Sequence, residues 1–401
     1  MTFRRPLLFA VSALLLVTAC GQPDNPAVPS PDLAPQFGTA GDDSANIVVA
    51  DPLRGRVYLA GTANATFTPP FDRTPGTPFF RRYDRAGRLV WERRMSRPGS
   101  VTGAAVGPGG NVVFSWATTK SFVTKYNAAG TRLFQLALRD LRVDGLTTDQ
   151  GGSIYVAGGA YSPFIRKYSP GGTLVWEKRL AIGPGEDGVG PPMLGVADLT
   201  ATPDGSLYLA GRSVDDYGYL VKLRARDGAV LGYEQLSGGS GLELEASGND
   251  AVYLRTAYED VLDGGRDYNV YKFRSDLSTA WVRGDLVPTT GGGGSRDNPE
   301  DDAYALSTDT SGNVYLTGAY VTDAYETDYF VRKFSASSVL LFDRRARVPE
   351  SNAAGLGIAA LSPDELYLVG TTTGKVNSKN YGGQDAFLIR TDGQGREVWG
   401  R

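Results

Sequence analysis

One short pattern recurs seven times between about residue 44 and the C-terminus, and it constrains the fold more than any other feature of the chain. Its first part is an apolar strand with tyrosine in second place in six copies and valine, Val113, in the other. A repeat of about 50 residues indicates one supersecondary unit that packs against copies of itself. The copies begin at Val57, Val112, Ile154, Leu207, Val252, Val314 and Leu366.

Two further signals complete each copy. A second strand carries a basic residue two places after an apolar one: Arg82, Lys125, Lys167, Lys222, Lys272, Lys333 and Arg390. A closing strand carries an aromatic residue: Trp91, Phe134, Trp176, Tyr233, Trp281, Phe342 and Trp399. We expect the aromatic rings to dock adjacent units, and the basic stems to pack there while the charged ends reach carbonyls, carboxylates or water. The alternative for the basic residues is a positive ring around a central channel.

Tight polar turns separate the strands of each copy, as at residues 107–111, 202–206 and 309–313. Such turns are hairpin signals, so each unit reads as a four-stranded antiparallel meander. A sheet with two apolar faces needs neighbours on both sides, and radial packing supplies them. The sequence therefore predicts an all-β fold, a seven-bladed β-propeller of four-stranded antiparallel blades over residues 37–401. The ring closes either by packing of unit seven on unit one or by an exchanged strand near residues 36–38.

Composition removes most catalytic chemistry. The chain has no histidine and one cysteine, which excludes His-based triads, His-containing metal sites and disulfides. Its 41 basic and 44 acidic residues give a net charge of −3, so no footprint for nucleic acid is present. Glycine (52) and proline (23) are too frequent for a mostly helical protein.

The N-terminus predicts export. Arg4 and Arg5 precede an apolar stretch over residues 7–17 that is too short to span a bilayer. The following Val17-Thr18-Ala19-Cys20-Gly21 resembles the lipobox of bacterial lipoproteins, which implies cleavage before Cys20 and its lipidation. The alternative is an ordinary signal peptide. We expect a signal peptide over 1–19 and a lipidated cysteine with a Pro-rich linker over 20–36. The folded body is then extracytoplasmic and lipid-anchored to the cell membrane or outer membrane.

The repeats resemble the bacterial beta-propeller repeat family often called SBBP. That family opens its units with a Gly-Asp-Asp-x-Ala entry, seen here at residues 41–45 and, less closely, at 300–303. Its later strands are matched best at residues 312–318 and 330–334, whereas unit five departs with Thr256 at a glycine place. The resemblance covers nearly all of residues 37–401 and implies no catalytic residues.

Topology assigns the loops to two faces. The loops after the second strand of each blade and the blade-to-blade connections share the face with long, unequal loops, where binding usually lies. Acidic and tyrosine residues gather there in units four to six, which suits a sugar or a basic protein patch. The alternative is a solvated edge. The candidate ligand-binding residues are Asp215, Asp216, Tyr217, Tyr258, Glu259, Asp260, Asp267, Tyr268, Asp323, Tyr325, Glu326 and Asp328.

No cofactor is expected. The segment 260–267 has oxygens compatible with calcium, but its spacing is not that of an EF-hand. We predict a monomeric, non-enzymatic binding or scaffold module for an envelope protein or glycan. One alternative is a carbohydrate-active enzyme, a glycosidase or lyase, with paired carboxylates such as Asp216 and Asp267. Another is an outer-membrane assembly scaffold, because the tryptophan position resembles that of quinone-binding propellers and related assembly lipoproteins.

Overall fold

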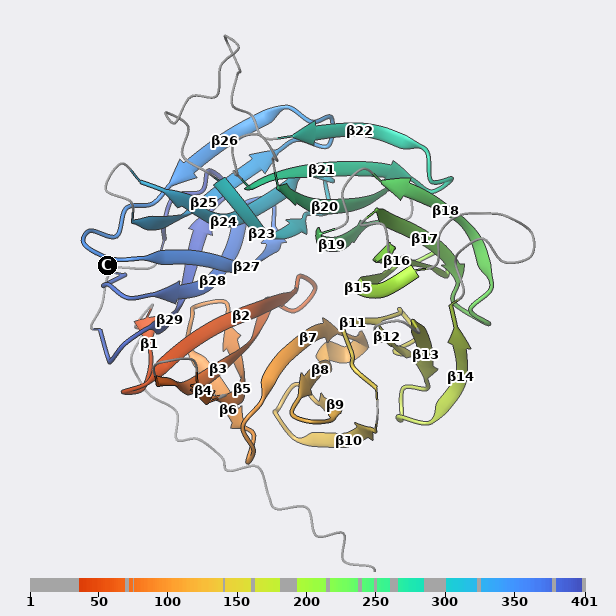
Figure 1. Cartoon of the computed structure of the whole chain (residues 1–401), viewed down its shortest axis with the longest axis horizontal. Coiled ribbons are helices and arrows are strands. Elements are labelled where there is room, and N and C mark those ends of the chain that lie inside the picture. Colours follow the sequence, from red (N-terminus) through yellow and green to blue (C-terminus); the bar gives the residue numbers. More distant parts are fainter. Residues whose placement is uncertain are drawn as a thin grey trace, which may run out of the picture.

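The computed structural model describes residues 36–68, 72–74, 76–139, 141–159, 163–180, 193–213, 217–236, 240–248, 251–259, 266–284, 301–322, 326–376 and 380–398. Seven antiparallel sheets surround one axis like the blades of a propeller (Figure 1). Six sheets have four strands, and the first blade carries a fifth, short strand that pairs with the end of its second strand. The predicted all-β, seven-bladed architecture is therefore confirmed.

Each blade runs from an innermost to an outermost strand (Figure 1). The innermost strands are β2 (Asp42–Asp51), β7 (Ser100–Val106), β11 (Gly145–Thr148), β15 (Met193–Ala201), β19 (Ser240–Ser247), β23 (Asp301–Thr308) and β27 (Ala353–Ser362). The second strands are β3 (Arg56–Thr68), β8 (Val112–Ala117), β12 (Ile154–Gly158), β16 (Ser206–Ser213), β20 (Ala251–Glu259), β24 (Val314–Val321) and β28 (Glu365–Thr372).

The third strands are β5 (Thr77–Asp84), β9 (Ser121–Tyr126), β13 (Phe164–Tyr168), β17 (Gly218–Arg224), β21 (Arg266–Arg274), β25 (Thr327–Phe334) and β29 (Asp385–Asp392). The outermost strands are β6 (Leu89–Arg94), β10 (Arg132–Leu138), β14 (Leu174–Arg179), β18 (Val230–Leu236), β22 (Thr279–Gly284), β26 (Leu340–Arg345) and, in blade seven, β1 (Gln36–Phe37). The short strand β4 (Asp72–Thr74) pairs with β3, and η1 (Pro108–Gly110) is a 3-10 turn. Within the described ranges, no helix has the length and apolar character to cross a membrane.

The core lies between the blades. Seven clusters of buried apolar side chains each join two adjacent blades, including one between blades seven and one. In that cluster Leu59 and Phe79 of blade one pack with Val369 and Leu388 of blade seven. No blade buries both of its faces alone, so each depends on its neighbours, as in other repeat architectures.

The repeated tyrosine and basic residues join neighbouring blades. Tyr58 is fully buried, and its hydroxyl donates to the carbonyl of Gly110 in blade two at 2.7 Å. Lys125 donates to the carbonyl of Pro170 in blade three at 2.8 Å. Carbonyls of the next blade likewise accept from Arg82, Lys167, Lys222, Lys272 and Lys333, while Arg390 pairs with Glu365 within its own blade. The prediction that the stems pack between blades while the charged ends reach carbonyls or carboxylates is confirmed, and the basic residues form no axial ring.

Four of the closing aromatic residues, Trp91, Phe134, Trp176 and Phe342, dock onto glycine turns of the next blade. The corresponding turns of blades five and six carry Leu277 and Ser338 at positive φ. Trp91 donates from its indole nitrogen to the carbonyl of Ala128 at 3.1 Å and lies over Gly130. Gly130 has a φ of 80°, and a Cβ there would come within 2.8 Å of the Trp91 ring. Only glycine meets both the backbone and the steric demand. The docking role is confirmed here, while Trp399 lies outside the described residues.

The ring closes by strand exchange. Strand β1 pairs antiparallel with β29, so the N-terminal side of the chain completes the edge of blade seven (Figure 1). Further along the same edge, the amide of Val398 donates to the carbonyl of Arg390 at 2.8 Å. Glu397 forms an isolated antiparallel β-bridge with Thr391 there. The fourth strand of blade seven is therefore shared between two distant parts of the chain. Gln36, which the sequence assigns to the linker, belongs to the propeller.

Candidate functional site

The start of each innermost strand lies on the face with the long loops. Near these starts six of the seven innermost strands contain a β-bulge, where one strand carries an extra residue against its partner. A bulge re-aims side chains and bends the strand. The repeat thus shapes the long-loop end of the propeller axis in the same way in most blades. The extra residues include Asn46, Thr102, Ala197, Tyr304 and Leu356.

The predicted binding residues divide into two groups. Tyr217 is 44% exposed beside strand β17, and Glu326 is partly exposed before β25. Tyr258 and Glu259 end strand β20, and Asp267 opposes Tyr258 in strand β21. The second group lies outside the described residues, as do Cys20 and most of segment 260–267: Asp215, Asp216, Asp260, Asp323 and Tyr325. Tyr268 and Asp328 belong to the described group.

Tyr268 and Asp328 are not surface residues. Each is 1% exposed, because strands β20 and β21, and likewise β24 and β25, continue pairing into what the sequence suggests are loops. Asp328 accepts the amide of Val348 at 2.9 Å, and burial raises its pKa. The hydroxyl of Tyr268 accepts from Arg332 at 2.6 Å. Both side chains stabilise the blades in this structure, which corrects their expected exposure.

Arg332 is the centre of a buried charged network in blade six. It is 3% exposed and contacts Asp301 at 2.5 Å and Asp343 at 3.0 Å. Asp301, with no exposed side-chain surface, also accepts from Arg345 at 2.6 Å. The adjacent negative groups outweigh burial and raise the pKa of Arg332, so the guanidinium stays charged. The network is structural, since its central groups are hidden from solvent.

The equivalent aspartates of the two entry motifs, Asp43 and Asp301, have different hydrogen-bond partners. Ala45 pairs with Gly61, and Ala303 pairs with Gly318, so Asp43 and Asp301 occupy equivalent places. Asp301 faces arginines, whereas Asp43 is held by neutral donors: the Thr39 amide at 2.6 Å, the Thr39 hydroxyl at 2.9 Å and the Asn64 amide at 3.1 Å. Burial is the main cause of the raised pKa of Asp43.

A pocket of about 320 Å³ lies at the entry of blade one, on the long-loop face. Its polar walls come from β2, β3 and the segment before β29, and Ser100 and Val101 of β7 form the side toward blade two. The size matches the lower end of ordinary small-molecule sites. The polar side chains contributed by blades one and seven are Asp42, Asp43, Ser44, Asn46, Thr62 and Gln384.

Asp42 is the carboxylate of the pocket that can still accept hydrogen bonds from a ligand. Its Oδ1 accepts the amide of Gln384 at 3.1 Å, and no donor from the described residues contacts Oδ2. Asn46 uses its carbonyl oxygen to accept from the Ser44 hydroxyl at 2.9 Å. Asp43, in contrast, has both oxygens occupied. The arrangement offers hydrogen-bond acceptors and a negative charge, and no described Lys or Arg lines it.

Sequence reasoning missed this pocket. The entry motif at residues 41–45 carries its carboxylates, but the wall at Gln384 lies 342 residues from Asp42 and meets it only when the ring closes. The one available signal was the entry motif itself, which is most complete in unit one. Among the described residues, no group of three or more carboxylates, cysteines or histidines is arranged to hold a metal ion.

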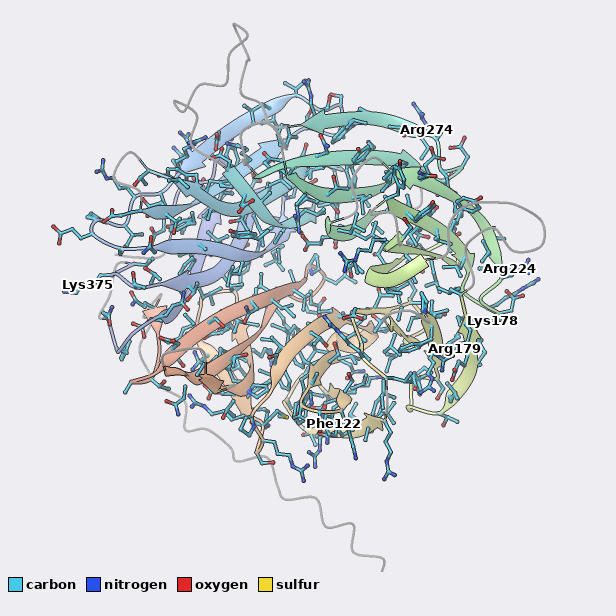
Figure 2. All side chains as sticks on the ribbon, in the orientation of Figure 1. Phe122, Lys178, Arg179, Arg224, Arg274 and Lys375 are labelled. Atoms are coloured by element: carbon cyan, nitrogen blue, oxygen red, sulfur yellow. The ribbon has the colours of Figure 1, made fainter. Side chains whose placement is uncertain are left out.

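A second group of carboxylates lies on the innermost strands of blades four and five. Asp198 accepts the amide of Leu244 at 2.8 Å, and Glu243 accepts the amide of Leu306 at 2.9 Å, so both link neighbouring blades. Glu243 keeps 31% of its side chain exposed, but protein surrounds it and disfavours its charge. Arg255 lies 3.5 Å from Glu243 and partly offsets the effect of burial on its pKa, whereas the labelled cations Lys178 and Arg274 lie at the outer edge of the ring (Figure 2).

These carboxylates predict a pH-dependent stability. Burial, followed by the charges of Glu243 and Asp198, raises the pKa of Glu245 to about 8. A carboxyl whose folded pKa is raised binds its proton more tightly in the native state, so stability falls as pH rises from about 4.5 to 8. We expect Glu245→Gln to raise the free energy of unfolding at pH 8 by about 1–2 kcal/mol and to leave it nearly unchanged at pH 5.

Urea denaturation at both pH values measures this difference. Glu234→Gln, on the exposed outermost strand β18, is the matched control and should change neither value. An equal effect of Glu245→Gln at the two pH values would contradict the assignment.

Comparison with known proteins supports the architecture alone. No protein-family model matches the chain, and no curated protein sequence does. Similar solved structures include the β-propeller domain of Cps50 (Swd1) from Myceliophteria thermophila, with 12% identity, a TM-score of 0.55 and coverage of 86% of this chain and 96% of that one. The WD40 domain of Neurospora crassa Pan2 is also similar, with 10% identity, a TM-score of 0.52 and coverage of 86% and 89%. At such identities the shared property is the β-propeller fold.

Proposed function

We propose that this protein is a lipid-anchored, extracytoplasmic β-propeller that binds an envelope glycan or protein through its long-loop face without catalysing a reaction. The pocket at the entry of blade one is the observation that carries the proposal. It lies on a scaffold whose blades are fixed by buried contacts on both sides, so its walls are largely preformed. Preformed concave sites with a few polar groups are the usual place for ligand binding.

The donors around Asp43 favour binding over catalysis. Glycoside cleavage uses two carboxyl groups that flank the reacting bond. In the pocket Asp43 is held through both oxygens by Thr39 and Asn64, which leaves Asp42 as the carboxylate able to reach a ligand. With one carboxylate available, the pocket can bind a ligand group but lacks the pair of carboxyl groups that glycoside cleavage uses.

The anchor is proposed from the lipobox-like segment before Gly21 and from the direction of strand β1. Strand β29 runs from the long-loop face toward the short turns, and β1 runs antiparallel to it. The chain therefore enters β1 from the side of the short turns. A membrane anchor upstream would then leave the long-loop face turned outward. The 15 residues between Cys20 and Gln36 would reach up to about 50 Å if extended.

The acidic and tyrosine loops of blades four to six are proposed as a second contact on the same face. Tyr217 and Glu326 present polar or aromatic surface there in the described part. A large partner held in the pocket could span to these loops. The contribution of Tyr268 and Asp328 is indirect, because both support the strands beneath.

Binding without turnover is the test of this function. The chain from Gly21 to Arg401 contains every strand of the ring and should bind at least one component of a glycan array or of solubilised envelope proteins saturably. The bound component should be recovered unchanged after prolonged incubation. Shortened glycan products would support the carbohydrate-active alternative, and selective capture of barrel-assembly components would support the assembly scaffold. The absence of any saturable binding would refute the proposal.

Cys20→Ser tests the anchor. We expect the variant to lose incorporation of a labelled fatty acid and to leave the washed membrane fraction, because the only cysteine of the chain is removed. Gln22→Ser, two residues further along, keeps Cys20 and should stay labelled and membrane-bound. Fatty-acid labelling of the Cys20→Ser variant equal to that of the parent protein would contradict lipidation at this residue.

A further inference from the structure

The chemistry of the entry pocket restricts its ligand. Asp42, Asn46 and Thr62, which carry side-chain oxygens, are among its lining residues, and the described walls carry carboxylates but no cationic side chain. A negative charge entering this space would lose its water and meet only like charge, which is costly. An anionic group is therefore a poor fit, while hydroxyl and ammonium groups find acceptors.

The volume sets a second limit. About 320 Å³ accommodates one sugar ring with its substituents but not a folded peptide segment. The small residues Ala65 and Gly76 form part of the wall, and a Cβ at Gly76 would lie 2.4 Å from the Ala63 carbonyl. The backbone is thus packed closely behind the wall, so the space cannot widen there without a change in blade one.

We infer that this pocket binds a single amino-sugar ring, with Asp42 pairing with the ammonium group and the neighbouring hydroxyl and amide side chains binding the ring hydroxyls. The inference rests on the proposed binding function and names the ligand class of the same site. Asp42 is suited to this role because its Oδ1 is fixed by the Gln384 amide at 3.1 Å. The carboxylate is therefore oriented before the ligand arrives, which reduces the ordering cost of binding.

Asp43 contributes to the position of the neighbouring backbone. Its amide donates to the carbonyl of Gln384 at 2.6 Å, next to the contact that Asp42 makes with the Gln384 amide. These two contacts, one from the Asp43 amide and one to the Asp42 carboxylate, tie the entry of blade one to the segment before β29. Asp42 is the ligand-binding residue.

Calorimetric titration of the chain from Gly21 to Arg401 with three methyl glycosides tests the inference. The probes are methyl glucosaminide, methyl N-acetylglucosaminide and methyl glucuronide, which carry a positive, a neutral and a negative group. We expect methyl glucosaminide to bind at least 10-fold more tightly than methyl glucuronide. Asp42→Asn should weaken methyl glucosaminide about 10-fold, should change methyl N-acetylglucosaminide less than 3-fold and should reduce the discrimination against methyl glucuronide.

Asp364→Asn is the matched control, because it removes the same charge from an exposed residue in a turn on the opposite face. It should leave all three affinities unchanged, and the melting temperature of each variant reports an intact fold. Equal binding of the three glycosides, or a preference that survives Asp42→Asn, would overturn the inference. Saturable binding of an envelope component without binding of any of these sugars would overturn it too, while the proposed binding function would stand.

Discussion

Replacing Asp301 with Asn is expected to lower the free energy of unfolding by about 3–5 kcal/mol. Asp301 has no exposed side-chain surface and contacts Arg332 at 2.5 Å and Arg345 at 2.6 Å. Without it Arg332, which is 3% exposed, would keep a buried positive charge with only partial compensation. The cost arises from the charge left behind more than from the contact that is lost.

Asp343→Asn is the matched control for this prediction. Asp343 also contacts Arg332, at 3.0 Å, but it is 28% exposed and water can replace part of its interaction. We expect a loss below about 1 kcal/mol in the same urea denaturation experiment. A loss for Asp301→Asn no larger than that for Asp343→Asn would show that burial does not govern the network.

The fold could be predicted because the same pattern of tyrosine, basic and aromatic positions recurs in the sequence of the blades. Most of the described tyrosine, basic and aromatic positions contact the next blade, so their recurrence marks the interface as well as the strand. Arg390 is an exception, because it pairs with Glu365 within blade seven. Trp91 and the turn at Gly130 illustrate this, since the ring of one unit needs the glycine of the next. A repeat in the sequence therefore predicts both the strands and the way in which they pack.

The candidate site could be predicted only in part, for two physical reasons. Polar residues between two strands indicate a loop, but in blades five and six the hairpins extend, so that Tyr258 pairs with Asp267 and Tyr320 with Asp328. Asp328 is thereby withdrawn from the surface. The pocket was missed because its wall at Gln384 meets Asp42 only through closure of the ring, a contact that no local pattern encodes.

Closure also explains why the equivalent aspartates have diverged. Asp43 sits beside the exchanged strand and is satisfied by Thr39, which lies between β1 and β2. Asp301 sits between two ordinary blades and is satisfied by arginines. The same position in the repeat thus stabilises a junction in one blade and a charged network in another. The blade at the junction has a pocket next to its entry motif.

The exchanged strand predicts the second large effect. Gln36→Ala should lower the free energy of unfolding by about 3 kcal/mol, because Gln36 is fully buried and its amide makes three hydrogen bonds to blade seven. Its Nε2 donates to Asp385 Oδ2 at 2.7 Å and to the Gly374 carbonyl at 2.9 Å, and its Oε1 accepts the Val376 amide at 2.9 Å. Alanine would leave these groups buried with fewer partners.

The neighbouring residues show why the chain cannot easily relax around that loss. Phe37 packs edge-on against Phe79 of blade one, with ring centroids 5.8 Å apart, and the guanidinium of Arg81 lies 3.9 Å from the Phe37 ring centroid. A Cβ at Gly38 would approach Asp385 Oδ1 to 2.0 Å. The segment is held from both blades, so it cannot shift to fill the space left by Gln36→Ala without breaking another contact.

Gln394→Ala, in an exposed turn of blade seven, is the control for the change of residue type and should cost less than about 0.5 kcal/mol. Removal of Val398 to Arg401 should also destabilise the ring, because Val398 pairs with Arg390 on the edge that β1 completes. If closure resides in β1, Gln36→Ala should lower the melting temperature more than this truncation does. The reverse order would place the main closure at the C-terminal segment, and unchanged melting of both variants would mean that packing between blades seven and one closes the ring without either strand.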